Sequence, residues 1–320
     1  MIKRIALLTS GGDAPGMNAT IRAVVRTAIY YNLEVFGIKK GYTGLINGEF
    51  LEMNLGSVAD IIHRGGTILQ TDRCQEFYTP EGRARAMSSM EKLGIEGLIT
   101  IGGDGTLHGA VELNKLGMPT IGIPGTIDND IPGTDRTIGF DTVVNTVLDA
   151  INKIRDTATS HERIFIIEVM GRKSGAIALA AGLAGGAESI LIPEIPLNLA
   201  EIVENVKRGK SRGKRHSIII LAEGVAHSME ITKQIGELTG LETRLSILGY
   251  IQRGGTPSAQ DRILASRMGA MAVKMLMNGE SNKMVASLAD EVTGRDLEQV
   301  LGQTRTINFK DYELAGVLSI

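Results

Sequence analysis

Asp128 and Asp130 are the two carboxylates whose spacing most directly suggests catalysis. They stand two residues apart in the segment Pro124–Asp130, directly after the apolar run Thr120–Ile123. In an extended segment, residues two apart point to the same face, so both carboxylates could act on one group. One can accept the proton of an attacking hydroxyl while the other orients that hydroxyl or assists a metal ion. The alternative is an Asp-rich surface turn, which is common in proteins.

Asp104 is a third carboxylate with a special setting. It stands among the glycines of Gly102–Thr106, which follows the apolar run Leu98–Ile101. There it can hold Mg²⁺ directly or through water, since Mg²⁺ typically takes one or two carboxylates plus nucleotide phosphates. This glycine-aspartate pattern occurs in several classes of kinase, so it indicates phosphoryl chemistry rather than one substrate. An Asp that only caps the following helix is the alternative.

A further glycine loop, Gly11–Asn18, joins the run Ile5–Leu8 to a helical pattern. Glycines let the backbone approach a phosphate, and a helix N-terminus adds N–H donors and partial positive charge. The loop is not a Walker A motif, because Met17 and Asn18 stand where Lys and Ser or Thr are required. It also lacks GxGxxG spacing, which argues against a dinucleotide-dependent oxidoreductase. A simple tight turn is the alternative.

Apolar runs alternate with helical patterns along the chain and must position these loops. The runs are Ile5–Leu8, Leu98–Ile101, Thr120–Ile123, Ile164–Val169 and Ser217–Leu221. Such runs are typical of strands buried on both faces, and their alternation with helices predicts parallel sheets of βαβ units. Ligands of such sheets bind beyond the carboxyl ends of the strands, where the glycine and aspartate turns fall.

The composition excludes several classes of protein. A length of 320 residues suits two domains, and 43% hydrophobic residues is ordinary for a globular chain. The net charge of -2 gives no reason to expect nucleic-acid or membrane binding driven by bulk charge. The single cysteine, Cys74, rules out an intramolecular disulfide. No apolar run suits a signal peptide or a bilayer span, so we expect a soluble, cytoplasmic protein.

The sequence resembles the bacterial ATP-dependent 6-phosphofructokinases. Six motifs carry the resemblance, in the order and spacing of that family: Thr9–Asn18, Gly102–Thr106, Pro124–Asp130, Glu168–Arg172, Ala222–Gly224 and Gln252–Gly255. The resemblance implies an α/β fold of two Rossmann-like, three-layer domains with mostly parallel sheets and the active site in the cleft between them. Residues 1–138 and 251–305 would form a larger domain that binds ATP and Mg²⁺. Residues 139–250 and 306–320 would form a smaller domain that binds fructose 6-phosphate.

The resemblance implies roles for the catalytic residues. Asp128 would be the general base that takes the proton of the sugar's 1-hydroxyl, and Thr126 and Asp130 would position that hydroxyl and the metal. Arg172 would offset the charge on the transferring phosphoryl group, which suits a reaction that depends mainly on positioning and charge stabilisation. Asp104 would bind Mg²⁺. The ATP site would be lined by Gly12, Arg73, Cys74, Gly103, Asp104, Gly105 and Thr106.

The resemblance also implies a sugar phosphate site. Glu223 would accept hydrogen bonds from sugar hydroxyls, and arginines would hold the 6-phosphate. The residues implied are Thr126, Ile127, Asp128, Arg163, Met170, Gly171, Arg172, Glu223, Arg244, Tyr250 and Arg253. In the family, Arg163 and Arg244 reach in from a neighbouring subunit of a homotetramer. Without the resemblance, each arginine could be a solvated surface charge.

Three positions bear on donor and substrate. In pyrophosphate-dependent relatives, Asp and Lys usually replace Gly105 and Gly125 and obstruct the ATP α-phosphate, so glycine at both positions favours ATP. Many relatives carry histidine where this chain has Tyr250, and a phenol cannot become cationic near neutral pH. The alternatives are a pyrophosphate-dependent enzyme, a kinase for another ketohexose phosphate, or a catalytically silent sensor of nucleotide or sugar phosphate.

The segment Lys207–Arg215 holds six basic residues. A solvated helix end explains them simply, and the lack of interleaved aromatic residues argues against nucleic acid. The resemblance implies a third interpretation, an allosteric site at a subunit interface that binds ADP or phosphoenolpyruvate. Its residues would be Arg22, Arg26, Arg155, Gly186, Glu188, Arg212, Lys214 and His216, with Glu188 holding the metal of a nucleotide diphosphate.

Overall fold

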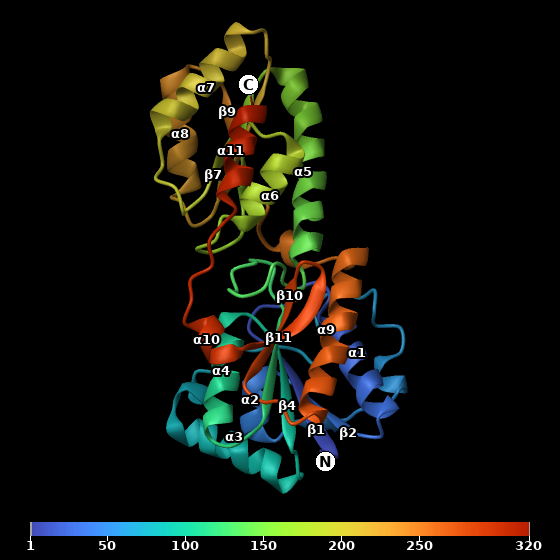
Figure 1. Cartoon of the computed structure of the whole chain (residues 1–320). Helices are drawn as coiled ribbons and strands as arrows, with labels where there is room; N and C mark the ends of the chain where they lie inside the picture. The colour runs from blue at the N-terminus through green and yellow to red at the C-terminus, as the bar shows by residue number, and fades with distance from the viewer. Residues whose placement is uncertain (1, 320) are drawn as a thin grey trace. The chain divides into compact units, whose positions relative to one another are not determined.

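The computed structural model describes residues 2–319 and contains two compact units (Figure 1). Unit 1 comprises Met1–Ile127, Ile131–Thr142 and Arg253–Arg305, and unit 2 comprises Asp128–Asp130, Val143–Gln252 and Thr306–Ile320. This division differs from the predicted domain boundaries near the crossings: Asp128–Asp130 and residues 251–252 fall in unit 2, and residues 139–142 fall in unit 1.

The sheet of unit 1 has seven strands in the order β11-β10-β5-β4-β1-β2-β3. They are β1 (Arg4–Ser10), β2 (Glu34–Ile38), β3 (Phe50–Glu52), β4 (Gly97–Gly102), β5 (Thr120–Pro124), β10 (Lys283–Leu288) and β11 (Glu291–Asp296). The five inner strands are parallel, and the edge strands β3 and β11 are antiparallel to their neighbours. Strands β4 and β5 are buried along their whole length, as their apolar runs predicted.

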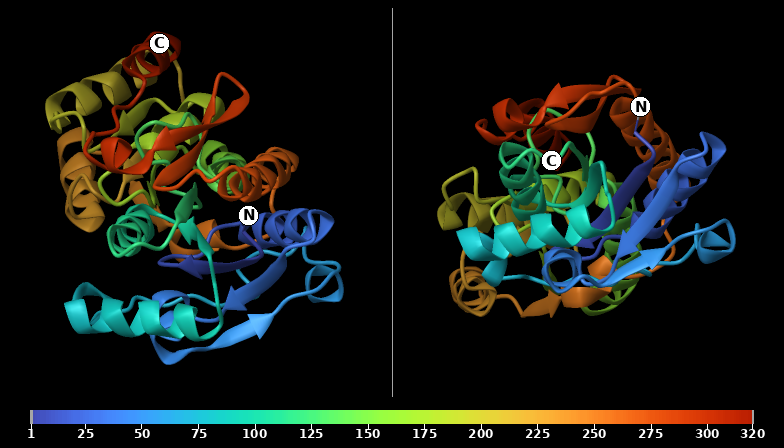
Figure 2. Two further views of the ribbon diagram at one scale, coloured as in Figure 1. Left: turned by 60° about the horizontal axis from the view of Figure 1, so that its bottom comes forward. Right: turned by 90° about the horizontal axis from the view of Figure 1, so that it is seen from below.

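Helices cover both faces of this sheet. On one face, α1 (Met17–Tyr30) packs against α9 (Ala259–Met277). The other face carries α2 (Gly41–Asn47), α3 (Pro80–Lys92), α4 (Asp104–Lys115) and α10 (Leu297–Leu301), as Figure 1 and Figure 2 show. Short 3₁₀ turns are η1 (Gly56–Val58) and η2 (Glu76–Tyr78). The two helical layers give the three-layer α/β arrangement that the alternation of runs and helices predicted.

The strand order reverses direction between β1 and β4. From β1 the chain moves to β2 on one side, and from β4 it moves to β5 on the other. The two strands are hydrogen-bonded neighbours, and their last residues, Ser10 and Gly102, stand opposite each other. Open α/β sheets bind ligands at such a reversal, beyond the carboxyl ends of the strands. The loops Gly11–Asn18 and Gly102–Thr106 begin at this point.

Unit 2 contains a four-stranded parallel sheet in the order β7-β8-β6-β9. Its strands are β6 (Ile164–Val169), β7 (Ser189–Leu191), β8 (Ser217–Ala222) and β9 (Thr243–Ile247). One helical layer contains α6 (Ala176–Gly185) and α11 (Phe309–Leu318) with α5 (Phe140–His161), and the other contains α7 (Leu199–Ser211) and α8 (Ser228–Thr239). The 3₁₀ turn η3 (Gly249–Arg253) follows β9. No helix within residues 2–319 is long and apolar enough to cross a membrane.

Candidate active site

Three loops meet at the carboxyl edge of the sheet of unit 1. The Gly125 N–H donates to the Gly102 carbonyl at 2.9 Å, and the Thr106 hydroxyl donates to the Ser10 carbonyl at 3.0 Å. A Cβ at Gly102 would lie 2.5 Å from the Ser10 carbonyl oxygen, so only glycine permits this approach. Hydrogen bonds and close packing thus link the ends of β1, β4 and β5.

Asp104 is the first residue of α4, and its side chain is 61% exposed. One turn later, Nδ1 of His108 lies 3.4 Å from its Oδ2. A carboxylate this accessible, at a helix N-terminus, can share a Mg²⁺ ion with nucleotide phosphates. No group of three or more His, Cys, Asp or Glu side chains within residues 2–319 is placed to hold a metal ion.

Gly103 and Gly105 occupy different kinds of space beside Asp104. The Cβ position of Gly103 lies 3.6 Å from Cβ of Thr126, so the second and third loops are in contact. No atom lies within 4 Å of the Cβ position of Gly105, so this part of the loop borders open space. Of the predicted ATP-site residues, Gly103 therefore lies beside Thr126, and Asp104, Gly105 and Thr106 form the first turn of α4 directly after it.

Arg73 and Cys74 reach the first loop through the residues before them. The Gly11 N–H donates to the Asp72 carbonyl at 3.4 Å, and the Thr71 hydroxyl donates to the Gly11 carbonyl at 2.7 Å. The half-buried Cys74 packs against the hydrophobic core of unit 1. The structure thus brings this segment to the glycine loop, as the ATP-site prediction requires.

Arg253 lies against the first loop. A Cβ at Gly12 would lie 2.8 Å from Nη1 of Arg253. The same Nη1 atom lies 3.9 Å from Oδ1 of Asp13. The sequence grouped Arg253 with Arg163 and Arg244 around a 6-phosphate. Within unit 1, the structure places Arg253 against the predicted ATP loop, whereas Arg163 and Arg244 belong to unit 2.

The segment Thr126–Asp130 bends rather than remaining extended. Asn129 has φ +48°, in the left-handed region, so Asp128 and Asp130 do not follow the simple alternation that the sequence suggested. Thr126 accepts a hydrogen bond at its carbonyl from the Thr137 hydroxyl at 2.6 Å. Asp128 is 6% exposed, and its Oδ2 lies 3.6 Å from Nε of Arg172. The predicted base and the predicted charge-stabilising group are therefore an ion pair within unit 2.

The loop after β6 carries Met170, Gly171 and Arg172. Arg172 has φ +52°, and its backbone N–H donates to Oε1 of Glu223 at 2.8 Å. Gly224 lets the backbone after β8 pack closely against Arg172, because a Cβ at Gly224 would lie 2.0 Å from the Arg172 carbonyl oxygen. The predicted sugar residues Met170–Arg172 and Glu223 thus meet at the carboxyl ends of β6 and β8.

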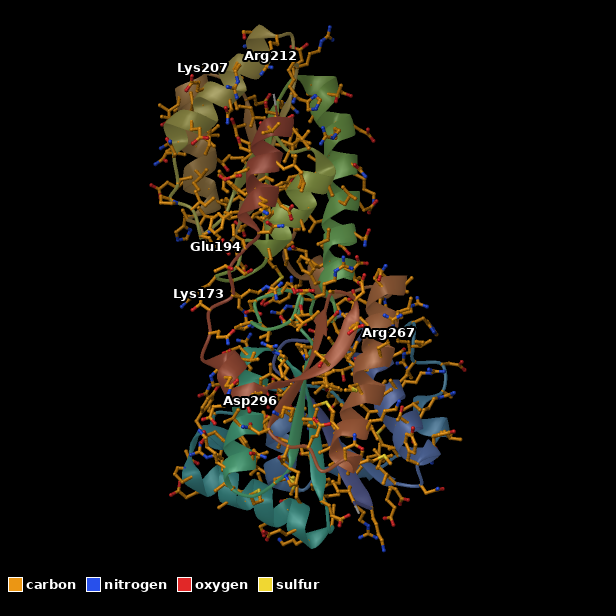
Figure 3. The ribbon with its side chains drawn as sticks, viewed as in Figure 1. Lys173, Glu194, Lys207, Arg212, Arg267 and Asp296 are labelled. Atoms are coloured by element: carbon orange, nitrogen blue, oxygen red, sulfur yellow. The ribbon has the colours of Figure 1, made fainter. Side chains whose placement is uncertain are left out.

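Two residues that were not predicted also hold this loop. Gln252 accepts from the Met170 N–H at 3.1 Å, and Glu194 accepts from the Gly175 N–H at 2.9 Å. Figure 3 shows Glu194 and Lys173 at the same end of unit 2. Gln252 stood inside a recognised motif, which could have drawn attention to it, whereas nothing in the sequence distinguished Glu194.

Arg163 and Arg244 lie at the opposite edge of the sheet of unit 2. Arg163 precedes the first residue of β6, and Arg244 is near the start of the neighbouring β9. Both pair with Glu242, Arg163 at 2.6 Å. Since β6 has six residues at ~3.3 Å each, its two ends lie roughly 20 Å apart. Within one chain, these arginines are therefore far from Met170–Arg172. Tyr250 is 80% exposed on η3.

Part of the predicted effector site also assembles in unit 2. The buried Glu188 pairs with Lys214 and accepts from the Ile218 N–H. His216 contacts the Thr159 hydroxyl at 3.3 Å, and burial lowers the pKa of its imidazole. Arg155 donates to the Gly185 and Gly186 carbonyls.

The remaining predicted effector residues, Arg212, Arg22 and Arg26, lie on α1 or just after α7. Arg212 follows α7, and its Nε donates to the Arg208 carbonyl at 3.4 Å. Figure 3 shows Lys207 and Arg212 at the opposite end of unit 2 from Lys173 and Glu194, away from the loop after β6. Arg22 and Arg26 lie on α1 in unit 1, where burial and the neighbouring Arg26 charge lower the pKa of Arg22.

Comparisons with known proteins show which family the chain is similar to. A family model described as phosphofructokinase matches residues 4–276. The ATP-dependent 6-phosphofructokinase of Bacillus pumilus is 59% identical over 319 residues, which cover 100% of both chains. Phosphofructokinase from Saccharomyces cerevisiae is 36% identical with a TM-score of 0.90, covering 99% of this chain and 48% of that chain. The chain thus spans about half the length of the yeast protein.

A pyrophosphate-dependent relative has the same fold. The pyrophosphate-dependent phosphofructokinase from Marinobacter aquaeolei is 25% identical with a TM-score of 0.86, covering 97% of this chain and 86% of that chain. The fold alone therefore does not distinguish the two donors. With a family model over most of its length and a full-length relative at 59% identity, the chain belongs to the phosphofructokinase family.

Proposed function

We propose that the chain transfers the γ-phosphoryl group of ATP to the 1-hydroxyl of fructose 6-phosphate in the cytoplasm, forming fructose 1,6-bisphosphate and ADP. The observation that carries the proposal is the ion pair between the buried Asp128 and Arg172 beside the loop after β6. It supplies a carboxylate to take a proton and a guanidinium to offset charge. The name of the full-length Bacillus pumilus relative supports ATP as the donor.

Unit 1 would bind ATP. Its glycine loops offer backbone N–H groups at the N-termini of α1 and α4, which favour the charge of phosphates. The open space at Gly105 leaves room beside the nucleotide, which favours ATP over pyrophosphate. Asp104 would hold Mg²⁺, which would neutralise part of the phosphate charge when it is bound.

In unit 2, Asp128 would accept the proton of the 1-hydroxyl as the oxygen attacks phosphorus. Asp130 and Thr126 would orient that hydroxyl. Arg172 would stabilise the charge that develops on the transferring group, and it is pre-positioned because its backbone is bound to Glu223. Phosphoryl transfer needs mainly such positioning and charge stabilisation.

Met170, Gly171 and Glu223 would bind the sugar, and arginines would bind its 6-phosphate. Because Arg163 and Arg244 lie at the far edge of the sheet, they would serve the active site of a neighbouring subunit in a homotetramer. Arg253 lies against Gly12. It would bind the 6-phosphate either in this position or after its side chain has moved.

The cluster of Arg155, Gly186, Glu188, Lys214 and His216 would bind a phosphorylated effector such as ADP or phosphoenolpyruvate. Lys214, Arg155 and the nearby Arg212 supply positive charge, and Glu188 supplies a carboxylate for a metal ion. Arg22 and Arg26 would complete the site from a neighbouring subunit. Binding there would change activity only if the effector had different affinities for two states of the enzyme.

The decisive experiment measures formation of fructose 1,6-bisphosphate by the wild-type chain with Mg-ATP and with Mg-pyrophosphate, beside Asp128→Asn. We expect turnover with ATP and a kcat reduced by roughly 10²–10⁴-fold in the variant, the usual contribution of a positioned base. Asp149→Asn is the matched control, because Asp149 is an exposed residue of α5 that pairs with Lys153. Turnover with pyrophosphate alone would overturn the choice of donor, and no turnover with either would favour a sensor.

A further inference from the structure

Gln252 belongs to η3 (Gly249–Arg253), and its side chain reaches the loop after β6, so it joins two segments that the proposed sugar phosphate site uses. Its side chain is fully buried, at 0% exposure, although it is polar. Its Oε1 accepts from the Met170 N–H at 3.1 Å, and its Nε2 donates to the Gly249 carbonyl at 3.0 Å. A buried amide that is bonded at both ends fixes the separation of the groups it joins, since losing either bond leaves a buried polar group unsatisfied.

The two segments joined in this way carry different parts of the proposed site. Met170 begins the loop that includes Gly171 and Arg172, which would hold the sugar and the transferring phosphoryl group. Gly249 begins η3, which includes Tyr250 and leads into Arg253. Gln252 therefore holds its own turn through the Gly249 carbonyl and links that turn to the sugar end of the site through the Met170 N–H.

The geometry points to Gln252 as a positioning residue for fructose 6-phosphate: it sets the distance between the Met170–Arg172 loop and the Gly249–Arg253 turn. This inference rests on the proposed function. Glu223 bonds to the Arg172 N–H two residues further along the loop, so Gln252 and Glu223 hold successive parts of it. Loss of the Gln252 bridge would let the loop and the turn move apart, and the affinity for the sugar phosphate would fall more than that for ATP.

The first test is Gln252→Met, which keeps the length of the side chain but removes both hydrogen bonds. We expect the KM for fructose 6-phosphate to rise at least roughly tenfold, as one or two buried hydrogen bonds are lost, with the KM for ATP within about twofold of wild type. Ser217→Ala is the matched control, because Ser217 is a buried polar residue at the amino end of β8. The Gln252 bond to Met170 lies at the other end of that sheet, beyond the carboxyl end of β6. It should leave both KM values unchanged.

Gln252→Glu supplies a pH readout that a purely structural role would not move. A protonated carboxyl can accept from the Met170 N–H and donate to the Gly249 carbonyl, whereas a carboxylate has no hydrogen to donate. The ratio of KM for fructose 6-phosphate in this variant to that of wild type should therefore rise with pH. The charged or ionisable groups on the neighbouring segments are Glu168, Arg172, Lys173, Glu223, Arg244, Tyr250 and Arg253, and wild type, which carries all of them, is the reference at each pH.

The outcomes separate this inference from the proposed function. If wild type forms no fructose 1,6-bisphosphate, the proposed function is wrong. A thermal midpoint near that of wild type would show that Gln252→Met is folded. If wild type is active and this folded variant keeps the wild-type KM for fructose 6-phosphate, the positioning role is wrong. Equal rises in KM for both substrates would also overturn it, because they would indicate general loosening. If Gln252→Met does not fold, a pH-independent KM ratio in Gln252→Glu overturns it.

Discussion

The Nε atom of Arg172 lies 3.6 Å from Oδ2 of Asp128, and the two side chains differ greatly in exposure, 54% against 8%. The guanidinium can therefore face an incoming phosphoryl group while it remains beside the carboxylate. Arg172 adopts the left-handed backbone conformation, which is unfavourable for a residue other than glycine and clusters at functional sites. The hydrogen bond from its N–H to Glu223 stabilises that conformation.

Arg172→Ala should lower kcat by roughly 10²–10³-fold, the range typical for loss of one group that stabilises transition-state charge. Arg172→Lys should recover only part of this, because an ammonium lacks the planar fork of donors. Steady-state kinetics with varied ATP and sugar phosphate would measure both. Lys173→Ala is the control from the next position, an exposed residue (Figure 3). Equal kcat values for Arg172→Ala and wild type would remove Arg172 from the chemistry.

Gly105 allows a direct test of donor selection. Because no atom lies within 4 Å of its Cβ position, the folded protein can accept a side chain there without a clash. Gly105→Asp should lower kcat/KM for ATP by roughly 10²-fold or more, since a carboxylate beside a phosphate costs a few kcal/mol of like-charge repulsion at low effective dielectric. The thermal midpoint should stay near that of wild type, because an acidic residue in the first turn of a helix is favourable.

Two further variants separate size from charge at this position. Gly105→Asn has the size of Asp without its charge, and Gly105→Ala adds only a methyl group. If obstruction dominates, Asn should impair ATP use nearly as much as Asp, and if charge dominates, Asn should resemble Ala. Unimpaired use of ATP by Gly105→Asp would contradict the proposed position of the nucleotide.

The sequence predicted the phosphate loops well because each lies directly after a buried strand. An apolar run followed by glycine and aspartate predicts where a strand ends and a helix begins, as Gly102–Thr106 shows at the end of β4 and the start of α4. The reversal of strand order between β1 and β4 then brings two such loops together. Local sequence patterns were sufficient to predict the α/β fold and the positions of these two loops, whereas their role in binding stays a prediction.

Contacts between distant segments were not predictable in the same way. Gln252 meets Met170 across 82 residues, and no periodicity or spacing encodes that pair. The packing of Arg253 on Gly12 likewise depends on the return of the chain into unit 1. The bend at Asn129 was missed because a left-handed residue in a short loop has only a weak signal when it is not glycine.

Arg163 and Arg244 predict a dependence of activity on the neighbouring subunit. Arg244→Ala and Asp128→Ala should each be nearly inactive alone, because each lacks one part of every active site. When the two are dissociated together and reassembled, some sites should combine an intact Asp128 with an intact Arg244 from the neighbour. Random pairing would restore up to roughly a quarter of wild-type activity. The measurement is the activity of the reassembled mixture, with each variant reassembled alone as the control. No recovery would mean that both residues serve the same chain's site.

The buried carboxyl group of Asp261 leads us to predict that the stability of the fold depends on pH. It lies in the first turn of α9 and is 1% exposed, yet its carboxylate accepts from the N–H groups of Gly139 and Thr142 at 2.9 and 2.8 Å. The Thr142 hydroxyl also donates to it at 2.5 Å. The carboxylate therefore caps the start of α5. Asp261→Asn should destabilise the fold by about 1–3 kcal/mol, since an amide places its own N–H₂ against these donors.

Burial raises the pKa of the Asp261 carboxyl above its unfolded value, although these hydrogen bonds oppose the shift. The native state then binds more protons than the unfolded chain between the two pKa values, so this group's contribution to stability falls as pH rises through that window. Asn does not titrate. The gap in thermal midpoint between wild type and Asp261→Asn should thus be widest at low pH and narrow towards neutrality.

Asp296→Asn is the control, because Asp296 caps α10 from a more exposed position where Asn caps equally well (Figure 3). A gap that widened with rising pH would show that the hydrogen bonds outweigh burial and that the pKa is lowered instead.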